Sequence, residues 1–70
     1  MKTSLLILEV GRRYRLTQRN RNCVTIRVSR VQRTEIGRCY TALRIGSSGA
    51  TYGREKMYWE MDFESVEEVT

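Results

Sequence analysis

Arginine is the residue type through which this sequence is best equipped to act on a partner. Every charged residue in the segment 11–33, "GRRYRLTQRNRNCVTIRVSRVQR", is an arginine. A guanidinium group keeps its charge at physiological pH and can grip a phosphate or a carboxylate through two parallel hydrogen bonds. The segment therefore indicates recognition of an anionic partner.

The charge of the chain is divided unevenly along its 70 residues, with a net value of +5. Residues 1–46 carry eleven basic residues, ten of them arginines, against Glu9 and Glu35, whereas residues 47–70 carry two basic residues against six acids. Six acids cannot neutralise ten arginines, so a basic surface remains for a negatively charged partner. The alternative is a solvated strand face that is partly paired with the acids of the tail.

The residue types that catalysis most often uses are scarce. The chain has no histidine, the commonest general base. Cys23 and Cys39 belong to no CxxC pair and cannot form a zinc ligand set. The tip "GSSG" at 46–49 lacks the lysine and the helix that follow a phosphate-binding loop. We expect no enzymatic activity, no metal and no cofactor. We also expect free thiols, and a disulfide between Cys23 and Cys39 is the alternative.

Five glycines and no proline punctuate short runs rich in Val, Ile, Thr and Tyr, a composition typical of strands. The apolar run at 4–10 predicts a first strand that bends at Gly11 and continues in alternation through 12–17. Alternating polarity predicts further strands at 23–31, 38–45 and 56–61. Residues 62–69 predict a turn followed by a final strand, and a short helix is the alternative. The apolar phase slips from Val28 to Val31, which predicts a β-bulge at Ser29 or Arg30.

These elements predict one all-β domain over residues 1–70. Four or five short strands in so small a chain favour a strongly bent antiparallel sheet or a small barrel, with one short helical turn near the C-terminus. The alternation places Trp59 in the core. It places Tyr40 on the face of its strand that points away from the core, together with Arg38 and Arg44. The other expected core residues are Val24, Ile26, Val28, Leu43 and Met57.

The apolar run "SLLILEV" at 4–10 is too short to span a bilayer and lacks the pattern of a signal peptide. We therefore expect a cytoplasmic protein without a membrane partner. Both faces of this predicted strand are apolar, and two accounts remain open. The strand is covered on both sides by its own core, or it packs against a second copy as a homodimer through Leu5, Leu6, Ile7 and Leu8.

The layout resembles that of the SH3-like barrels, including the KOW and Tudor-type modules. The resemblance rests on a bent first strand at "LEVGRRYRLT", a kinked second strand, the tip "GSSG" and a turn before the last strand at "DFESVEEV". The glycine pattern of a KOW motif and the aromatic cage of a Tudor-type reader are absent. The resemblance therefore implies a fold and a tendency to bind, and assigns no residue role. The chain also looks like small proteins encoded by bacteriophages.

The arginine-rich strands and their loop predict a nucleic-acid-binding surface with an aromatic among its guanidinium groups. The expected binding residues are Arg13, Arg15, Arg19, Arg21, Arg27, Arg33, Arg38, Tyr40 and Arg44. DNA and RNA are equally open as ligands. The alternative partner is an acidic protein surface, with the chain acting as a phage-type inhibitor or adaptor of a host protein involved in nucleic-acid processing.

Overall fold

Five antiparallel strands form one bent, unclosed sheet in the computed structural model of the chain, which describes residues 7–69. In sequence they are β1 (Arg13–Gln18), β2 (Cys23–Thr34), β3 (Gly37–Ile45), β4 (Thr51–Trp59) and β5 (Phe63–Val69), with one 3-10 turn, η1 (Glu60–Asp62), before β5. Their order across the sheet is β4-β3-β2-β1-β5. The predicted all-β class, the bent antiparallel sheet and the short helical turn near the C-terminus are confirmed.

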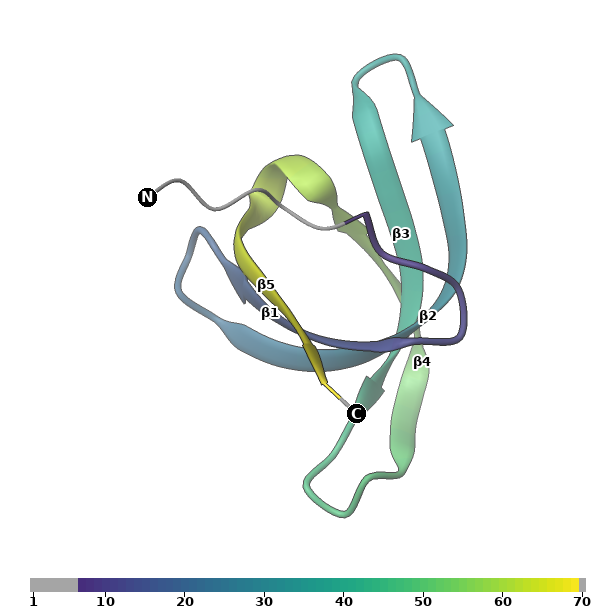
Figure 1. Cartoon of the computed structure of the whole chain (residues 1–70), viewed down its shortest axis with the longest axis vertical. Helices are drawn as coiled ribbons and strands as arrows, with labels where there is room; N and C mark the ends of the chain where they lie inside the picture. Colours follow the sequence, from purple (N-terminus) through teal and green to yellow (C-terminus); the bar gives the residue numbers. More distant parts are fainter. Residues whose placement is uncertain (1–6, 70) are drawn as a thin grey trace.

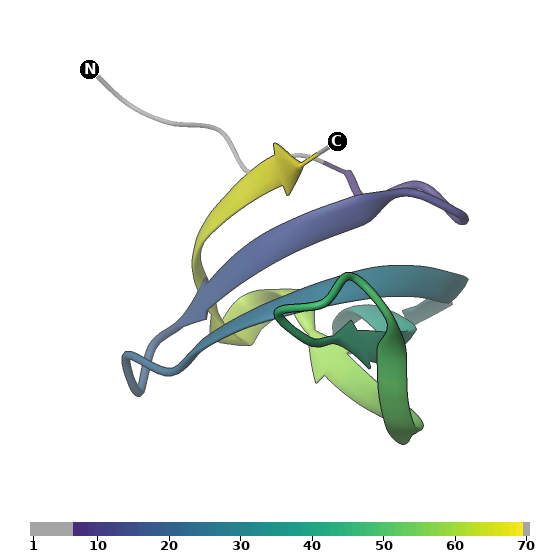
Figure 2. The ribbon, with the colours of Figure 1, turned by 90° about the horizontal axis from the view of Figure 1, so that it is seen from below.

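The long strand β2 makes the sheet bend, because its two halves pair with different neighbours. Its first half pairs with β1, and its second half pairs with β3 (Figure 1). The register shifts between Val28, which faces Ala42, and Arg30, which faces Thr41, so Ser29 is the extra residue of a β-bulge. The predicted bulge is confirmed. Figure 2 shows the result, with β1 and β5 on one side of the molecule and β3 and β4 on the other.

The core lies on the inner face of the bent sheet. Tyr14 and Ile26 are register partners there, and the ring of Tyr40 stacks on Phe63 with centroids 5.9 Å apart. Hydrophobic burial of this kind is the main favourable contribution to folding. The buried cluster consists of Leu8, Tyr14, Leu16, Ile26, Val28, Tyr40, Ala42, Tyr58 and Phe63, with Val24, Val31 and Val66 packed against it.

The predicted faces of the third and fourth strands are wrong, because Tyr40 and Tyr58 face the core in place of their apolar neighbours. Met57 is 57% exposed, and Leu43 and Trp59 are partly exposed and do not belong to the core cluster. The bulge determines which side chains of β3 and β4 face the core. It makes Val31 the register partner of Tyr40, and Tyr40 is in turn the register partner of Tyr58. A buried tyrosine also needs a partner for its hydroxyl, and Tyr40 has one.

The predicted first strand is absent over residues 7–10, which belong to no strand. Two core tyrosines hold this segment instead: the N–H of Leu8 donates to the Tyr40 hydroxyl at 3.2 Å, and the N–H of Glu9 donates to the Tyr14 hydroxyl at 2.9 Å. Leu8 is buried in the core of its own chain, whereas Ile7 is 62% exposed. Leu5 and Leu6 lie outside the described residues, so dimerisation through this segment stays a prediction.

The remaining strand boundaries differ modestly from those predicted. β2 runs on to Thr34, and β4 begins at Thr51 instead of Lys56. The C-terminal segment forms the predicted final strand, so the helical alternative is wrong. Over residues 7–69, no helix has the length and apolar character needed to cross a membrane.

Candidate nucleic-acid interface

Four exposed arginines gather on the outer face of β1 and β2, the face turned away from the core. Arg13 of β1 lies directly opposite Arg27 of β2, and Arg15 lies opposite Thr25. Register partners in an antiparallel ladder project to the same side of the sheet. Together with Arg30, these residues form what we call the arginine cluster: Arg13, Arg15, Arg27 and Arg30.

The bulge in β2 is what brings Arg30 into the cluster. Side chains alternate between faces along a regular strand, so residues three positions apart point to opposite sides. Because Ser29 is the extra residue, Arg27 and Arg30 both project outward, with Leu43 and Thr41 as their partners on β3. Arg30 was not among the predicted binding residues. The phase slip from Val28 to Val31 contained the information that could have included it.

The cluster is poorly neutralised by the acids of the chain. Its one ion pair among the described residues joins Arg15 to Glu67 at 3.9 Å, and both side chains are more than half exposed. Exposed pairs of this kind contribute little to stability. Arg13, Arg27 and Arg30 form no ion pair with any residue in the described part of the chain.

The neighbouring residue Arg12 forms ion pairs with two acids, one before β1 and one in β5. It binds Glu68 at 2.7 Å and Glu9 at 2.9 Å. The hydrogen bond that Arg12 donates to Glu68, followed by the negative charges of Glu68 and Glu9, raises the pKa of the Arg12 guanidinium. Arg12 is therefore committed to intramolecular pairs, whereas the cluster beside it keeps its excess charge.

Four predicted site residues, Arg33, Arg38, Tyr40 and Arg44, have the phase of the other side of the sheet. Tyr40 is completely buried in the core, so the prediction that its ring is offered to a ligand on the arginine face is wrong. Arg38 and Arg44 share the inward phase of Tyr40 and lie toward opposite ends of β3. The guanidinium of Arg44 stands over the ring of Tyr52, 5.0 Å from its centroid, and its buried Nε has no hydrogen-bond partner in the described structure.

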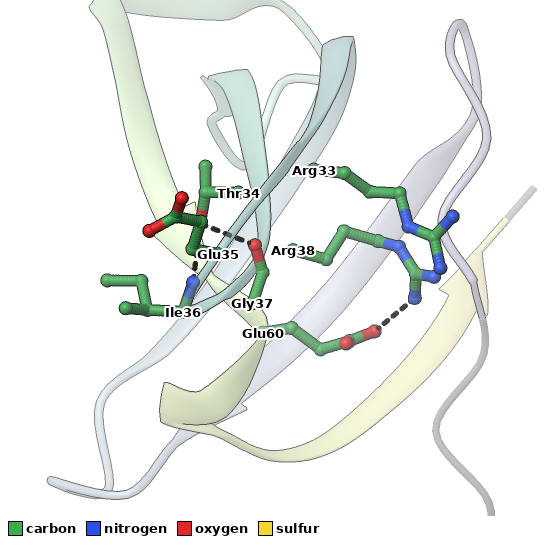
Figure 3. A pocket seen from close by; sticks show the side chains of 7 residues that line it. All are labelled: Arg33, Thr34, Glu35, Ile36, Gly37, Arg38 and Glu60. Atoms are coloured by element: carbon green, nitrogen blue, oxygen red, sulfur yellow. Dashed lines mark hydrogen bonds and ion pairs between the residues drawn. The ribbon is translucent and has the colours of Figure 1, made fainter.

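Arg33 and Arg38 form a separate basic pair at the β2–β3 hairpin (Figure 3). They are register partners, and the figure shows their side chains running in parallel beside Glu60. Arg38 donates to Glu60 at 3.0 Å, and the Tyr40 hydroxyl donates to the same carboxylate oxygen at 3.4 Å. The nearby Tyr40 hydroxyl and Glu60 carboxylate raise the pKa of Arg38. This pair borders an open hollow of about 410 Å³ and does not join the arginine cluster.

The two loop arginines have different roles. Arg19 connects the β1–β2 loop to η1, because its N–H donates to the carbonyl of Asp62 at 2.9 Å and its Nε donates to the carbonyl of Met61 at 2.7 Å. Arg21 is exposed and adopts a positive φ of 72° in the turn. Arg21 therefore extends freely from the tip, whereas Arg19 is partly committed to holding the loop.

An apolar strip continues the outer face beyond the arginine cluster. Met57 and Trp59 of β4 lie opposite Thr41 and Cys39 of β3. Thr41 in turn faces Arg30, so one row across the sheet runs from arginine through threonine to methionine. Trp59, and not Tyr40, is the aromatic residue of this face. Sequence reasoning missed it because both alternating positions of β4 carry apolar or aromatic side chains.

Cys39 is the register partner of Trp59 and lies beside it on the outer face. Its own side chain is completely buried although it projects outward, and its row neighbours are Gln32 and Trp59. The indole is the largest side chain beside it. Burial raises the pKa of the Cys39 thiol, partly offset by a backbone hydrogen bond from Tyr58.

The described residues contain no group of three or more His, Cys, Asp or Glu side chains that could hold a metal ion. Both cysteines are unpaired, Cys23 exposed and Cys39 buried. Comparison of the chain with protein-family models, with curated proteins and with solved structures gave no match.

Proposed function

We propose that the chain is a binding module, not an enzyme, and that it binds nucleic acid through the arginine cluster. The observation that carries this proposal is the direct opposition of Arg13 and Arg27 without an acidic partner among the described residues. Like charges placed opposite each other on neighbouring strands destabilise a sheet. A phosphate bound between them would turn this repulsion into two charge-assisted contacts.

The proposal includes a fold type and a compartment. The kink of β2 and the single turn before β5 support an SH3-like arrangement, because they are two of the four features on which the resemblance in the sequence rested. Unpaired Cys23 and Cys39 fit a reducing compartment such as the cytoplasm.

Binding is tested by fluorescence anisotropy with labelled random-sequence single-stranded DNA, duplex DNA and RNA at about 50 mM and about 200 mM salt. Phosphate contacts release counterions, so affinity falls steeply as salt rises. The triple variant Arg13→Gln, Arg27→Gln, Arg30→Gln should reduce the log–log salt slope by up to about 3.

The matched control removes the same net charge from elsewhere on the surface, with Arg33→Gln, Arg54→Gln and Lys56→Gln. All three positions are exposed and lie outside the cluster. The control should keep most of the affinity and of the salt slope. Equal losses in the two triple variants would mean that the chain responds only to net charge, and the proposed site would be wrong.

A protein partner is the second candidate, and the apolar side chains near the hairpin and η1 favour it. Ile36, Met57 and Met61 are 68%, 57% and 48% exposed. Methionine, aromatic residues and arginine are enriched at protein interfaces. Recovery of one acidic protein on the immobilised chain, lost in the cluster variant and without nucleic-acid affinity at low salt, would favour this function over the first.

A further inference from the structure

We propose that the ligand is single-stranded nucleic acid, and that one of its bases stacks on Trp59 while its phosphates lie on the arginine cluster. This inference rests on the proposed function, and it adds both the class of nucleic acid and the residue that contacts a base. Three features of the outer face support it: the arginine cluster and the apolar strip are adjacent, the indole of Trp59 is partly buried beside Cys39, and the sheet is bent.

The arginine cluster and the apolar strip are adjacent parts of one surface. Arg30, Thr41 and Met57 lie in one row on β2, β3 and β4. Neighbouring strands are about 4.8 Å apart, so about 10 Å of sheet separates the backbones of Arg30 and Met57. A nucleotide is itself divided into a charged phosphate and a flat apolar base. The surface therefore offers a complementary group to each part.

Trp59 is held in the manner expected of a stacking platform. It is partly exposed, and it lies beside the fully buried Cys39 on the outer face, outside the core cluster. We infer that partial burial restricts the indole, and a restricted side chain loses little conformational entropy when a ligand binds. Aromatic side chains of this kind bind bases of any identity, because every base has a π-face.

The bend of the sheet favours a single strand over a duplex. Arg27 and Arg30 lie on the two sides of the Ser29 bulge. The core fills the inner face of the bent sheet, so the outer face is its convex side (Figure 2). A duplex is stiff over about 150 base pairs and keeps its bases stacked inside the helix. A single strand can turn with the surface and present an unstacked base.

Trp59 is the only tryptophan of the chain, so its fluorescence reports directly on this contact. The titration compares three probes of equal length: a single-stranded oligothymidylate, a duplex, and an abasic oligomer that keeps its phosphates. The oligothymidylate should bind and quench Trp59. The abasic oligomer should bind more weakly, by about tenfold or more, and leave the fluorescence unchanged.

Variants assign the effect to the indole. Trp59→Ala should lower affinity for the oligothymidylate by about tenfold or more and leave abasic binding unchanged, whereas Trp59→Phe should retain most of the affinity. Tyr52→Ala is the matched control, because Tyr52 is a 52% exposed aromatic that packs against Arg44. The wild-type titration keeps the test decisive if Trp59→Ala fails to fold.

The outcomes separate this inference from the function on which it rests. Binding of the duplex as tight as that of the single strand, with Trp59 fluorescence unchanged by either, would overturn the stacking inference and leave nucleic-acid binding intact. Failure of all three probes to bind at low salt would overturn both. Quenching by the oligothymidylate alone, with the expected loss in Trp59→Ala, would support both.

Discussion

The hydroxyl of Tyr40 accepts a hydrogen bond from the backbone N–H of Leu8 at 3.2 Å, although the two residues are 32 positions apart. The same hydroxyl lies 3.4 Å from a carboxylate oxygen of Glu60, to which it donates. Tyr40 is completely buried and Leu8 is 1% exposed. One hydroxyl thus fastens the N-terminal segment to the core and connects it to the turn before the last strand.

We expect Tyr40→Phe to destabilise the fold by about 1–3 kcal/mol, because it leaves the buried N–H of Leu8 without an acceptor. The ring keeps its stacking on Phe63, so the change isolates the hydroxyl. Urea unfolding followed by Trp59 fluorescence measures the free energy of unfolding. Tyr52→Phe is the control, since the Tyr52 side chain is 52% exposed, and it should change stability little. Equal stability of Tyr40→Phe and wild type would contradict this role.

The opposition of Arg13 and Arg27 predicts that the ligand-free fold is weakened by its own cluster. Arg27→Gln should raise the free energy of unfolding by a few tenths of a kcal/mol at low salt, because it removes a cross-strand repulsion. Added salt should stabilise the wild type and reduce the difference, since screening weakens the repulsion. Urea titrations at two salt concentrations measure both effects.

The same substitution at Arg54 serves as the control, because Arg54 lies in β4, two strands away from β2. Arg54→Gln should leave stability nearly unchanged at either salt concentration. A loss of stability in Arg27→Gln, or a gain equal to that of Arg54→Gln, would show that Arg13 and Arg27 do not repel each other in the folded state.

Local pattern was enough to predict the strand class, the bulge and the final strand. The bulge is the clearest case, because Val28 and Val31 can both reach the core only if one extra residue lies between them. Residues 62–69 are less decisive, because Phe63, Val66 and Val69 are three positions apart and also suit a short helix. They form an edge strand next to β1, and the register shifts between Thr17 and Gln18. For the bulge, the side chains of one short segment contain the whole signal.

Local pattern failed where both faces of a strand carry apolar or aromatic side chains. In β4, Tyr58 and Trp59 both suit a core, and hydropathy favours the tryptophan. The choice depends on long-range register: Tyr58 faces Tyr40, and Tyr40 can be buried because Leu8 and Glu60 satisfy its hydroxyl. These partners are distant from Tyr40 in the sequence. Local pattern therefore cannot show that Tyr40 faces the core and that Trp59 lies on the outer face.

The two thiols should react at very different rates with a thiol-specific reagent, because Cys23 is exposed and Cys39 is buried. The raised pKa of Cys39 further lowers its reactive thiolate fraction at neutral pH. We expect one fast equivalent from Cys23 and one slow equivalent from Cys39. Trp59→Ala should accelerate the slow phase, since the indole is the largest neighbour of Cys39 in its row.

Tyr52→Ala should leave both phases unchanged, because Tyr52 packs against Arg44 and not beside Cys39. The variant Cys23→Ser assigns the fast phase by removing it. Two fast equivalents in the wild type would mean that Cys39 is not covered in solution, and the firm setting proposed for Trp59 would then be wrong.

Alkaline pH should destabilise the fold through two buried acids. Burial raises the pKa of the Cys39 thiol above its ordinary 9.0 and the pKa of the Tyr58 hydroxyl above its ordinary 10.0. The unfolded chain therefore releases these protons at lower pH than the folded chain does. Stability from both groups is fully present below pH 9.0 and declines as pH rises through the ordinary value toward the folded one. Urea unfolding from neutral pH to above pH 10.0 measures this decline.

The cysteine part of the alkaline effect can be separated by substitution. Cys39→Ala should flatten the decline that begins near pH 9.0, while the later decline from Tyr58 remains. Cys23→Ala is the matched control, because it makes the same substitution at an exposed thiol. A profile that is flat from neutral pH to pH 10.0 in the wild type would show that the Cys39 thiol ionises as easily in the folded chain as in the unfolded one.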